Sequence, residues 1–246
     1  ISSSADATAM TIDSNEKIII GDTASHVDDL LQIETPASGG GHGIQIRRND
    51  SNSDQLIGRI MFGNNTDTDL ATISAVTDGA NDNARLAFST QPDGGSSTER
   101  MRIDHNGVIT APAQPAFDAG RNSGYVTDDQ NFIQDYARTN IGSHYDTSNG
   151  RFTAPVAGQY LVMFRIFTHD SGGVVQAEVT LKKNAGDAFI ARAHKVGGYH
   201  TPVQVTKVLT LAANDYIQTY VGDSGTSSGW QGSAHEYNYF CAFLIG

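Results

Sequence analysis

The sequence predicts an all-β protein, and three observations support this fold class. The 246 residues include 26 glycines, short segments alternate apolar with polar side chains, and clusters of Gly, Asn and Asp separate these segments. Alternation with a period of two is typical of strands, and Asn-Gly pairs are typical of hairpin turns. The composition disfavours a helical protein.

The segment 160–167, YLVMFRIF, carries apolar side chains on both faces and therefore predicts a central strand. Turn signals at Asn149–Gly150 and Ala157–Gly158 flank RFTAPV, which predicts a series of hairpins. A second strand, turn and strand pattern covers residues 180–190 around the polar segment Lys182–Gly186.

The N-terminal part has little material for a core of its own. Residues 1–111 contain two Phe, no Tyr and no Trp, and segments 9–19 and 100–110 resemble each other as strand, Asp/Asn turn and strand. Such short β-repeats commonly associate with identical neighbours as a fibrous stack or a trimer. The segment APAQP marks a boundary, which predicts a β-repeat shaft-like domain at 1–111, a linker at 112–115 and a second domain at 116–246.

Charge and hydropathy exclude several classes of partner. The net charge of −11 and the pI near 5.0 disfavour nucleic acid, which requires clustered Lys and Arg. No apolar run approaches the ~20 residues that cross a bilayer, and the N-terminus shows no export signal, so we expect no membrane insertion. The single Cys241 lies in an apolar C-terminal segment and is expected to be a small buried residue.

The segment 140–164, NIGSHYDTSNGRFTAPVAGQYLVMF, resembles the globular head of complement-one-q and tumour-necrosis-factor-like proteins. The matching positions are an Asn, aromatics and a Gly-x-Tyr, namely Asn140, Tyr145, Phe152, Gly158, Tyr160 and Phe164. Two positions depart from the pattern, because Gln134 and Val162 stand where the family has Phe. The resemblance covers about 115–246 and implies a C-terminal jelly-roll β-sandwich that forms a homotrimer.

A second resemblance concerns the N-terminal domain, where segments 99–112, 85–90 and 30–34 resemble repeats of phage tail fibres. Shaft-like repeats followed by a head imply the distal segment of a tail fibre in a virion. The expected partners are two further copies of the chain, a host-surface glycan or protein, and other virion or fibre proteins. The alternative is an extracellular fibre or matrix subunit of a bacterium or archaeon with a trimerising head.

Motifs for catalysis and metal binding are weak. Gly222-Asp223-Ser224-Gly225 resembles a serine-protease loop, but no matching His element is present, so we expect no enzyme. A glycan-degrading tip would need converging carboxylates, for which Asp223 and Glu236 are available.

Metal binding is left open rather than assigned to residues. His194 and His200 match no zinc spacing, although three copies around an axis could form a ring of imidazoles. The clusters Asn64–Asp69 and Asp78–Asn83 offer oxygen ligands for calcium, but such residues are more typical of turns. No other cofactor is expected.

Aromatic residues in polar loops are the best candidates for receptor binding, because their rings stack on sugars and anchor protein contacts. Trp230 lies between Gly229 and Gln231 in a Gly/Ser-rich loop and is expected to be exposed. Tyr199 and His200 lie in another predicted loop. We therefore predict that Trp230, Tyr199 and His200 contact the receptor.

Overall fold

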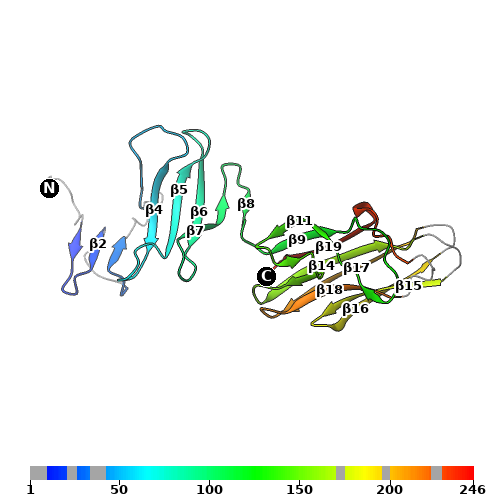
Figure 1. Cartoon of the computed structure of the whole chain (residues 1–246). Helices are drawn as coiled ribbons and strands as arrows, with labels where there is room; N and C mark the ends of the chain where they lie inside the picture. Colours follow the sequence, from blue (N-terminus) through cyan, green and yellow to red (C-terminus); the bar gives the residue numbers. More distant parts are fainter. Residues whose placement is uncertain (1–9, 21–26, 34–42, 170–174, 196–199, 223–228) are drawn as a thin grey trace. The chain divides into compact units, whose positions relative to one another are not determined.

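A computed structural model describes residues 10–20, 27–33, 43–169, 175–195, 200–222 and 229–246 (Figure 1). Contacts divide the chain into two units, Ile1–Val108 and Ile109–Gly246, and each is described by itself below. The regular elements in these described ranges are strands and one 3-10 turn, His235–Tyr237. None of the described helical residues forms a segment long and apolar enough to span a membrane.

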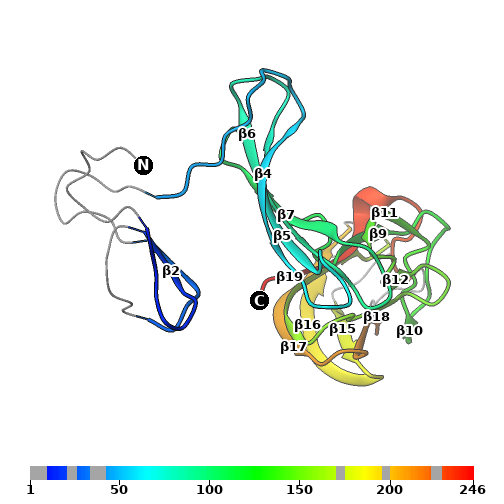
Figure 2. The same ribbon diagram turned by 90° about the vertical axis from the view of Figure 1, so that its left-hand side faces the viewer.

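The second unit consists of antiparallel sheets that lie face to face as the expected jelly-roll sandwich (Figures 1 and 2). One sheet has the order β11-β9-β19-β14-β17, with the bounds Tyr136–Ile141, Ala116–Gly120, Asn238–Leu244, Gly158–Phe167 and Pro202–Leu211. The other has the order β12-β13-β18-β15-β16, with the bounds Tyr145–Asp146, Arg151–Thr153, Tyr216–Val221, Val175–Lys183 and Gly186–Lys195. In addition, β10 (Gln130–Asn131) pairs with β18.

Strand β14 is the interior strand that its sequence predicts. It pairs with β17 on one side and with β19 on the other. Tyr160, Val162, Phe164 and Ile166 are completely buried in the core, and the alternating side chains point away from it. The two-residue period thus places one apolar set between the sheets and a second set on the outer face.

Stacked aromatic rings form the centre of the core between the two sheets. The ring of Phe117 lies 4.6 Å from that of Tyr145 and 4.8 Å from that of Phe152, and both pairs are stacked. Phe240 meets Phe117 edge-on at 4.8 Å. Such ring pairs add about 0.5–1.5 kcal/mol each beyond the area that they bury.

Two of the predicted hairpins are confirmed, β12-β13 and β15-β16. The hairpin expected at Ala157–Gly158 is wrong, because the segment between β13 and β14 crosses from one sheet to the other. Asn184 and Ala185 connect β15 to β16 with φ angles of 49° and 66°, as a two-residue turn of the primed type requires. Gly150 ends the turn between β12 and β13 with a φ of 71°. The side chain of Asp146 accepts a 2.9 Å hydrogen bond from the amide of Ser148 in the same turn.

The first unit contains two separate sheets. One has the order β1-β2-β3, with the bounds Thr11–Ile12, Ile18–Ile20 and Leu31–Ile33. The other has the order β4-β5-β6-β7-β8, with the bounds Leu56–Phe62, Ala71–Thr77, Ala84–Thr90, Thr98–Ile103 and Ile109–Thr110. The short β8 is the last strand of this sheet and lies just after the boundary at Val108.

The internal resemblance in the sequence corresponds to two turns of the same geometry. The amide of Asp13 donates to the carbonyl of Lys17 at 3.1 Å, and the amide of Asp104 donates to the carbonyl of Val108 at 3.0 Å. In both turns the Asp side chain accepts hydrogen bonds from the amides two and four residues later. The Asp carboxylate therefore closes both turns in the same way.

Candidate functional site

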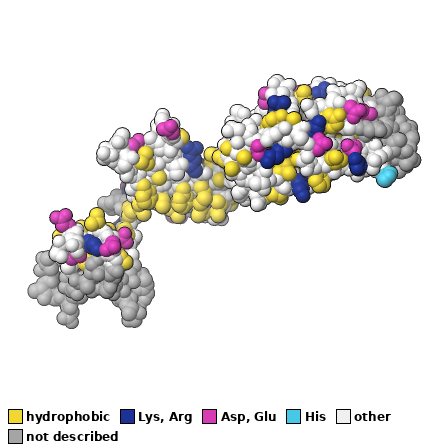
Figure 3. All heavy atoms as spheres, turned by 90° about the horizontal axis from the view of Figure 1, so that it is seen from below, with side chains coloured by type: hydrophobic (Ala, Val, Ile, Leu, Met, Phe, Trp, Pro, Cys, Tyr) yellow, Lys and Arg dark blue, Asp and Glu magenta, His cyan; other side chains and the backbone are white. Residues whose placement is uncertain are grey.

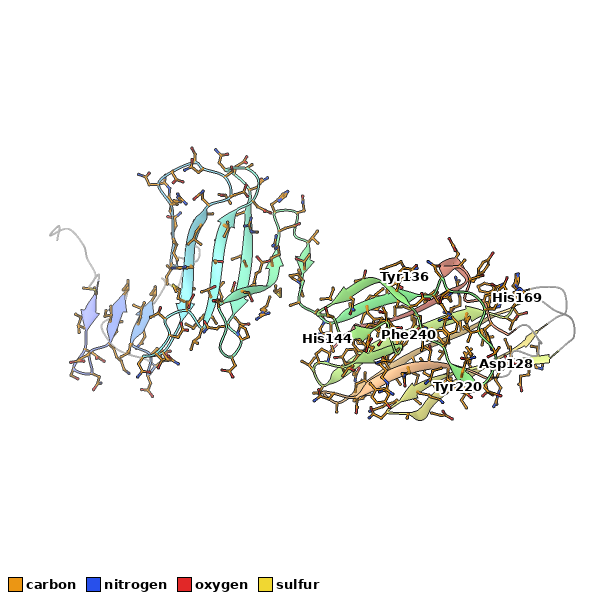
Figure 4. The ribbon with its side chains drawn as sticks, in the orientation of Figure 1. Asp128, Tyr136, His144, His169, Tyr220 and Phe240 are labelled. Atoms are coloured by element: carbon orange, nitrogen blue, oxygen red, sulfur yellow. The ribbon has the colours of Figure 1, made fainter. Side chains whose placement is uncertain are left out.

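The candidate site lies at the end of the second unit where β14 stops and β17 begins. Because these strands are antiparallel with Phe167 opposite Pro202, His169 and His200 come together just beyond the last pair. The amide of Thr168 donates to the carbonyl of Thr201 at 2.9 Å and holds the two segments together. Figure 4 shows His169 at the opposite end of the unit from His144.

Five rings form a chain of contacts here, which we call the ring strip: Tyr125, His169, His200, Tyr237 and Phe167. The Tyr125 ring lies 3.9 Å from His169, and His169 lies 5.8 Å from His200. His200 lies 6.0 Å from Tyr237, which meets Phe167 at 5.7 Å. Tyr125, His200 and Tyr237 are exposed, so ring faces and edges are available to a partner.

Hydrogen bonds fix the orientation of one imidazole in the strip. The Nδ1 atom of His200 lies 3.0 Å from the carbonyl oxygen of Thr168, and 3.3 Å from Nε2 of Gln231. This nitrogen of His200 donates to the Thr168 carbonyl in one tautomer and accepts from the Gln231 amide in the other, so either tautomer holds the ring in this orientation. The Nδ1 atom of His169 is buried and has no hydrogen-bond partner among the described residues. The strip thus combines stacking surfaces with groups able to form hydrogen bonds.

Trp230 does not contact solvent, so the expectation of an exposed side chain is wrong. It is 0% exposed, and its Nε1 atom donates a 3.1 Å hydrogen bond to the carbonyl of Gly222. Its backbone amide and carbonyl pair with Val126 at 2.7 and 2.9 Å. Gly229, with a φ of 75°, passes so close to Val126 that a Cβ atom would lie 2.1 Å from its carbonyl oxygen. These backbone contacts direct the indole into the core beneath the ring strip.

The other two residues predicted to contact the receptor are His200 and Tyr199. His200 is exposed and belongs to the ring strip. Tyr199 lies outside the described residues. Tyr125, His169 and Tyr237 were not among the residues that the sequence predicted for receptor contact. The available signals were the position of Tyr125 after Ser-Gly in a polar segment and of His169 at the polar end of an apolar strand.

A second surface feature is a row of apolar side chains on the outer face of the sheet that contains β14. Pairing across the strands aligns them as Ile141, Ala116, Phe243, Leu161 and Val208, which we call the outer apolar row. Phe243 is 38% exposed and Val208 is 44% exposed. The row spans the whole sheet, so its apolar surface is continuous rather than scattered.

Several side chains beside this row contact other residues of the same chain. The guanidinium of Arg138 donates two hydrogen bonds to the Asp118 carboxylate, at 2.7 and 2.9 Å, and this ion pair raises the pKa of Arg138. Arg165 lies over the ring of Tyr239, with 5.0 Å to its centre. Cys241 faces outward next to Met163 but is buried, and desolvation raises the pKa of its thiol to about 12.

Possible metal ligands do not converge in the described part of the chain, where no group of three or more His, Cys, Asp or Glu is arranged to hold an ion. In the cluster Asn64–Asp69, the Asn64 side chain accepts hydrogen bonds from the amides of Thr66 and Asp67, at 2.8 and 2.9 Å. The Asp67 carboxylate accepts from the amide of Asp69 and from Gln91, and these bonds lower its pKa. These oxygens therefore close a turn.

Comparisons with known proteins concern the second unit. The C1q domain model matches residues 116–245. Complement C1q tumor necrosis factor-related protein 3 of Homo sapiens is 27% identical over 137 residues, which cover 56% of this chain and 53% of that protein. Caprin-2 of Danio rerio is 29% identical over 132 residues, which cover 53% of this chain and 14% of that protein. The chain therefore spans about half of the human relative and a smaller part of the fish one.

One of the similar solved structures is the globular domain of zebrafish complement 1qA. It aligns with a TM-score of 0.45 and 20% sequence identity, covering 54% of this chain and 98% of that chain.

Proposed function

Because this chain belongs to the C1q domain family through residues 116–245, we propose that it is a homotrimeric recognition protein without catalytic activity. In this proposal its second unit forms the head. Three heads pack through the outer apolar row, and the ring strip of each contacts a molecule on a cell surface.

The outer apolar row is the observation that carries the proposal. Leu161 pairs with Phe243 on one side and with Val208 on the other, at the middle of a surface that a single chain leaves in water. Burying it gains roughly 25 cal/mol per Å² of apolar area. The neighbouring Arg138–Asp118 ion pair is complete within one chain and needs no partner charge. An apolar surface of this kind suits packing against identical copies.

The ring strip suits contact rather than covalent chemistry. Tyr125 and Tyr237 offer exposed ring surface, and the exposed His200 adds an imidazole able to form hydrogen bonds. Rings of this kind stack on sugars and on apolar side chains of a receptor. Three strips in one oligomer would raise the effective concentration at a cell surface, so a weak contact at each strip suffices.

Two larger assemblies are compatible with this head. A distal segment of a virion tail fibre and an extracellular fibre of a bacterium or archaeon both fit a shaft-like unit followed by a head. The matched relatives come from Homo sapiens and Danio rerio and give no support to the virion placement. Immunogold electron microscopy with antibodies against the head distinguishes the two, since labelled fibres without particles favour the cellular one.

The oligomer is tested by the mass of the full chain in solution at two concentrations. We expect a trimer at both, and weaker association for Leu161→Asp, because a carboxylate would be buried within the row. Gln159→Asp is the matched control, since Gln159 lies on the same outer face of β14 but outside the row. A monomeric wild type, or a Leu161→Asp variant that associates as tightly as the wild type, contradicts the proposal.

Receptor contact is tested by binding of the labelled full chain to a glycan array and to intact cells. Tyr125→Ala should lose most of the signal and keep the mass of the wild type. Phe189→Ala, which removes an exposed ring from β16, serves as the control and should bind normally. Unchanged binding of Tyr125→Ala would remove the ring strip from the proposed function.

A further inference from the structure

The sheet β4-β5-β6-β7-β8 of the first unit has one apolar face. Its strand pairing aligns Ile60, Ile73, Phe88 and Met101 in an unbroken row across four neighbouring strands. Gly58, Ala75, Leu86 and Ile103 form a second row beside it. Figure 3 shows hydrophobic side chains gathered over this part of the molecule. We call this surface the shaft face.

The opposite face of the same sheet is more polar, although Met61 and Val76 also lie on it. The residues that alternate with the first row are Arg59, Ser74, Ala87 and Arg102. Ala87 is buried among the longer side chains of this face, and Arg102 pairs with Glu99 at 2.5 Å. The sheet is therefore amphipathic, with one side suited to water and one side suited to a core.

No second layer covers the shaft face within the described part of the unit. Ile60 and Phe62 are each 53% exposed, and Leu86 is exposed as well. Ile46 packs directly on Gly58, where a Cβ atom would lie 2.2 Å from its Cγ2 atom. Between Ile46 and Leu86 the face is hollowed by about 150 Å³, which a side chain from outside could fill.

The β1-β2-β3 sheet shows the same property independently. Pairing across its strands aligns Ile12, Ile18 and Leu31, and all three side chains are exposed. Ile20 and Ile33 pair in the same sheet and are also exposed. Both sheets of the unit therefore leave one apolar face open. Isolated sheets of this size need such a face covered to be stable in water.

We propose that the shaft face is covered by the same face of the other copies of this chain, which rests on the homotrimer proposed above. The two rows contain no charged residue, so identical faces meet without repulsion between like charges. Because the rows carry no charge, they contain no group that would attract a charged partner. In a symmetric assembly each copy uses the same surface, and an uncharged apolar row can pack against the identical row of another copy.

The connection to the head brings the faces together. Strand β8, the last strand of the shaft sheet, ends at Thr110, and β9 begins at Ala116. The five residues between them, 111–115, let these two strand ends lie at most about 20 Å apart. Three heads joined at the outer apolar row would therefore hold three shaft faces within reach of one another at high effective concentration. Packing of the shaft then adds to the association of the heads.

The test uses single thiols in the full chain with Cys241 replaced by Ala. Ile73→Cys places a thiol in the middle of the shaft face, and Ser74→Cys, on the same strand, places one on the polar face. A short bis-maleimide should convert Ile73→Cys into covalently linked dimers, while Ser74→Cys stays a single chain on a denaturing gel. The native mass is measured on the same samples.

The outcomes separate this inference from the proposed function. A trimeric mass without cross-linking of Ile73→Cys overturns the inference and leaves the trimeric head standing. A monomeric mass overturns both. Cross-linking in a dimer supports the shaft face and contradicts the threefold head. If the wild-type chain instead co-sediments with phosphatidylcholine vesicles and Ile73→Cys fails to cross-link, the face is a lipid contact and the inference is wrong.

Discussion

The hydroxyl of Tyr145 donates a 2.7 Å hydrogen bond to the side-chain carbonyl of Gln134 in the core of the head. The Gln134 amide donates to the Thr219 hydroxyl at 3.0 Å, and that hydroxyl donates to the carbonyl of Phe132 at 2.8 Å. Burial raises the pKa of Tyr145 well above its ordinary value. A polar network thus surrounds Gln134, at a position where the sequence departs from the family pattern that it resembles, and the nearby Phe132 fills part of the core.

This network predicts coupled effects of mutation. Gln134→Leu and Tyr145→Phe should each lower the free energy of unfolding by about 1–3 kcal/mol, because each leaves a buried polar partner without its bond. The double variant should lose less than the sum of the two. Urea unfolding of the four proteins at one chain concentration measures this, and strict additivity would show that the bond contributes nothing.

Trp230 predicts a spectroscopic signature, since it is the single Trp of the chain. Its fluorescence should be blue-shifted and poorly quenched by acrylamide in the native protein, and should become red-shifted on unfolding. Trp230→Phe should cost about 1–3 kcal/mol of stability, through the void and the lost bond to Gly222. Strong quenching of the native protein would mean that the indole is exposed after all.

Cys241 should be unreactive in the folded protein. Desolvation raises the pKa of its thiol to about 12, so the reactive thiolate is scarce at pH 8. A thiol reagent at pH 8 should modify less than a tenth of the chains during a time that suffices for the urea-unfolded protein. Rapid modification of the native chain would contradict both the burial and the raised pKa.

The lowered pKa of Asp215 should make the folded protein less stable in acid. A hydrogen bond and ion pair with Lys183 at 2.7 Å, together with bonds from Asn184 and Ala212, lower the pKa of Asp215 to about 2. Because the folded pKa lies below the unfolded value of about 3.9, the contribution is complete above pH 4 and is lost as the pH falls towards 2.

The variant Asp215→Asn tests this dependence. It should melt at a lower temperature than the wild type at pH 6, and the difference should shrink as the pH falls from 4 to 2. Asp187→Asn, which changes another carboxylate at the start of β16, is the matched control. A difference that stays constant over this range would show that ionisation of Asp215 is not the cause.

Several features of the head were predictable because they depend on neighbouring residues. The alternation in 160–167 predicted the interior strand, and Asn149–Gly150 predicted a turn. Cys241 was correctly expected to be buried. The side chain of Asn140 bonds both the amide and the carbonyl of Tyr145, which links two positions of the family pattern that the sequence already showed at their spacing.

The candidate site was only partly predictable. His200 was named from its loop, but its neighbours His169 and Tyr125 come from segments 31 and 75 residues away in the sequence. Trp230 lies in a segment whose composition is typical of an exposed loop, yet its backbone pairs with Val126 and its indole is buried. Nothing in the local sequence indicates those contacts.

The sequence by itself determined the all-β class, the strand and turn positions of the head and its membership of a family, because side-chain period and turn chemistry act over a few residues. It also indicated that 1–111, with two Phe, no Tyr and no Trp, has few aromatic side chains for a core of its own. Only the tertiary structure decided which aromatic rings reach the surface and that the apolar residues of each shaft sheet share one face. Exposure and shared faces depend on strand pairing between distant segments, which the local sequence does not encode.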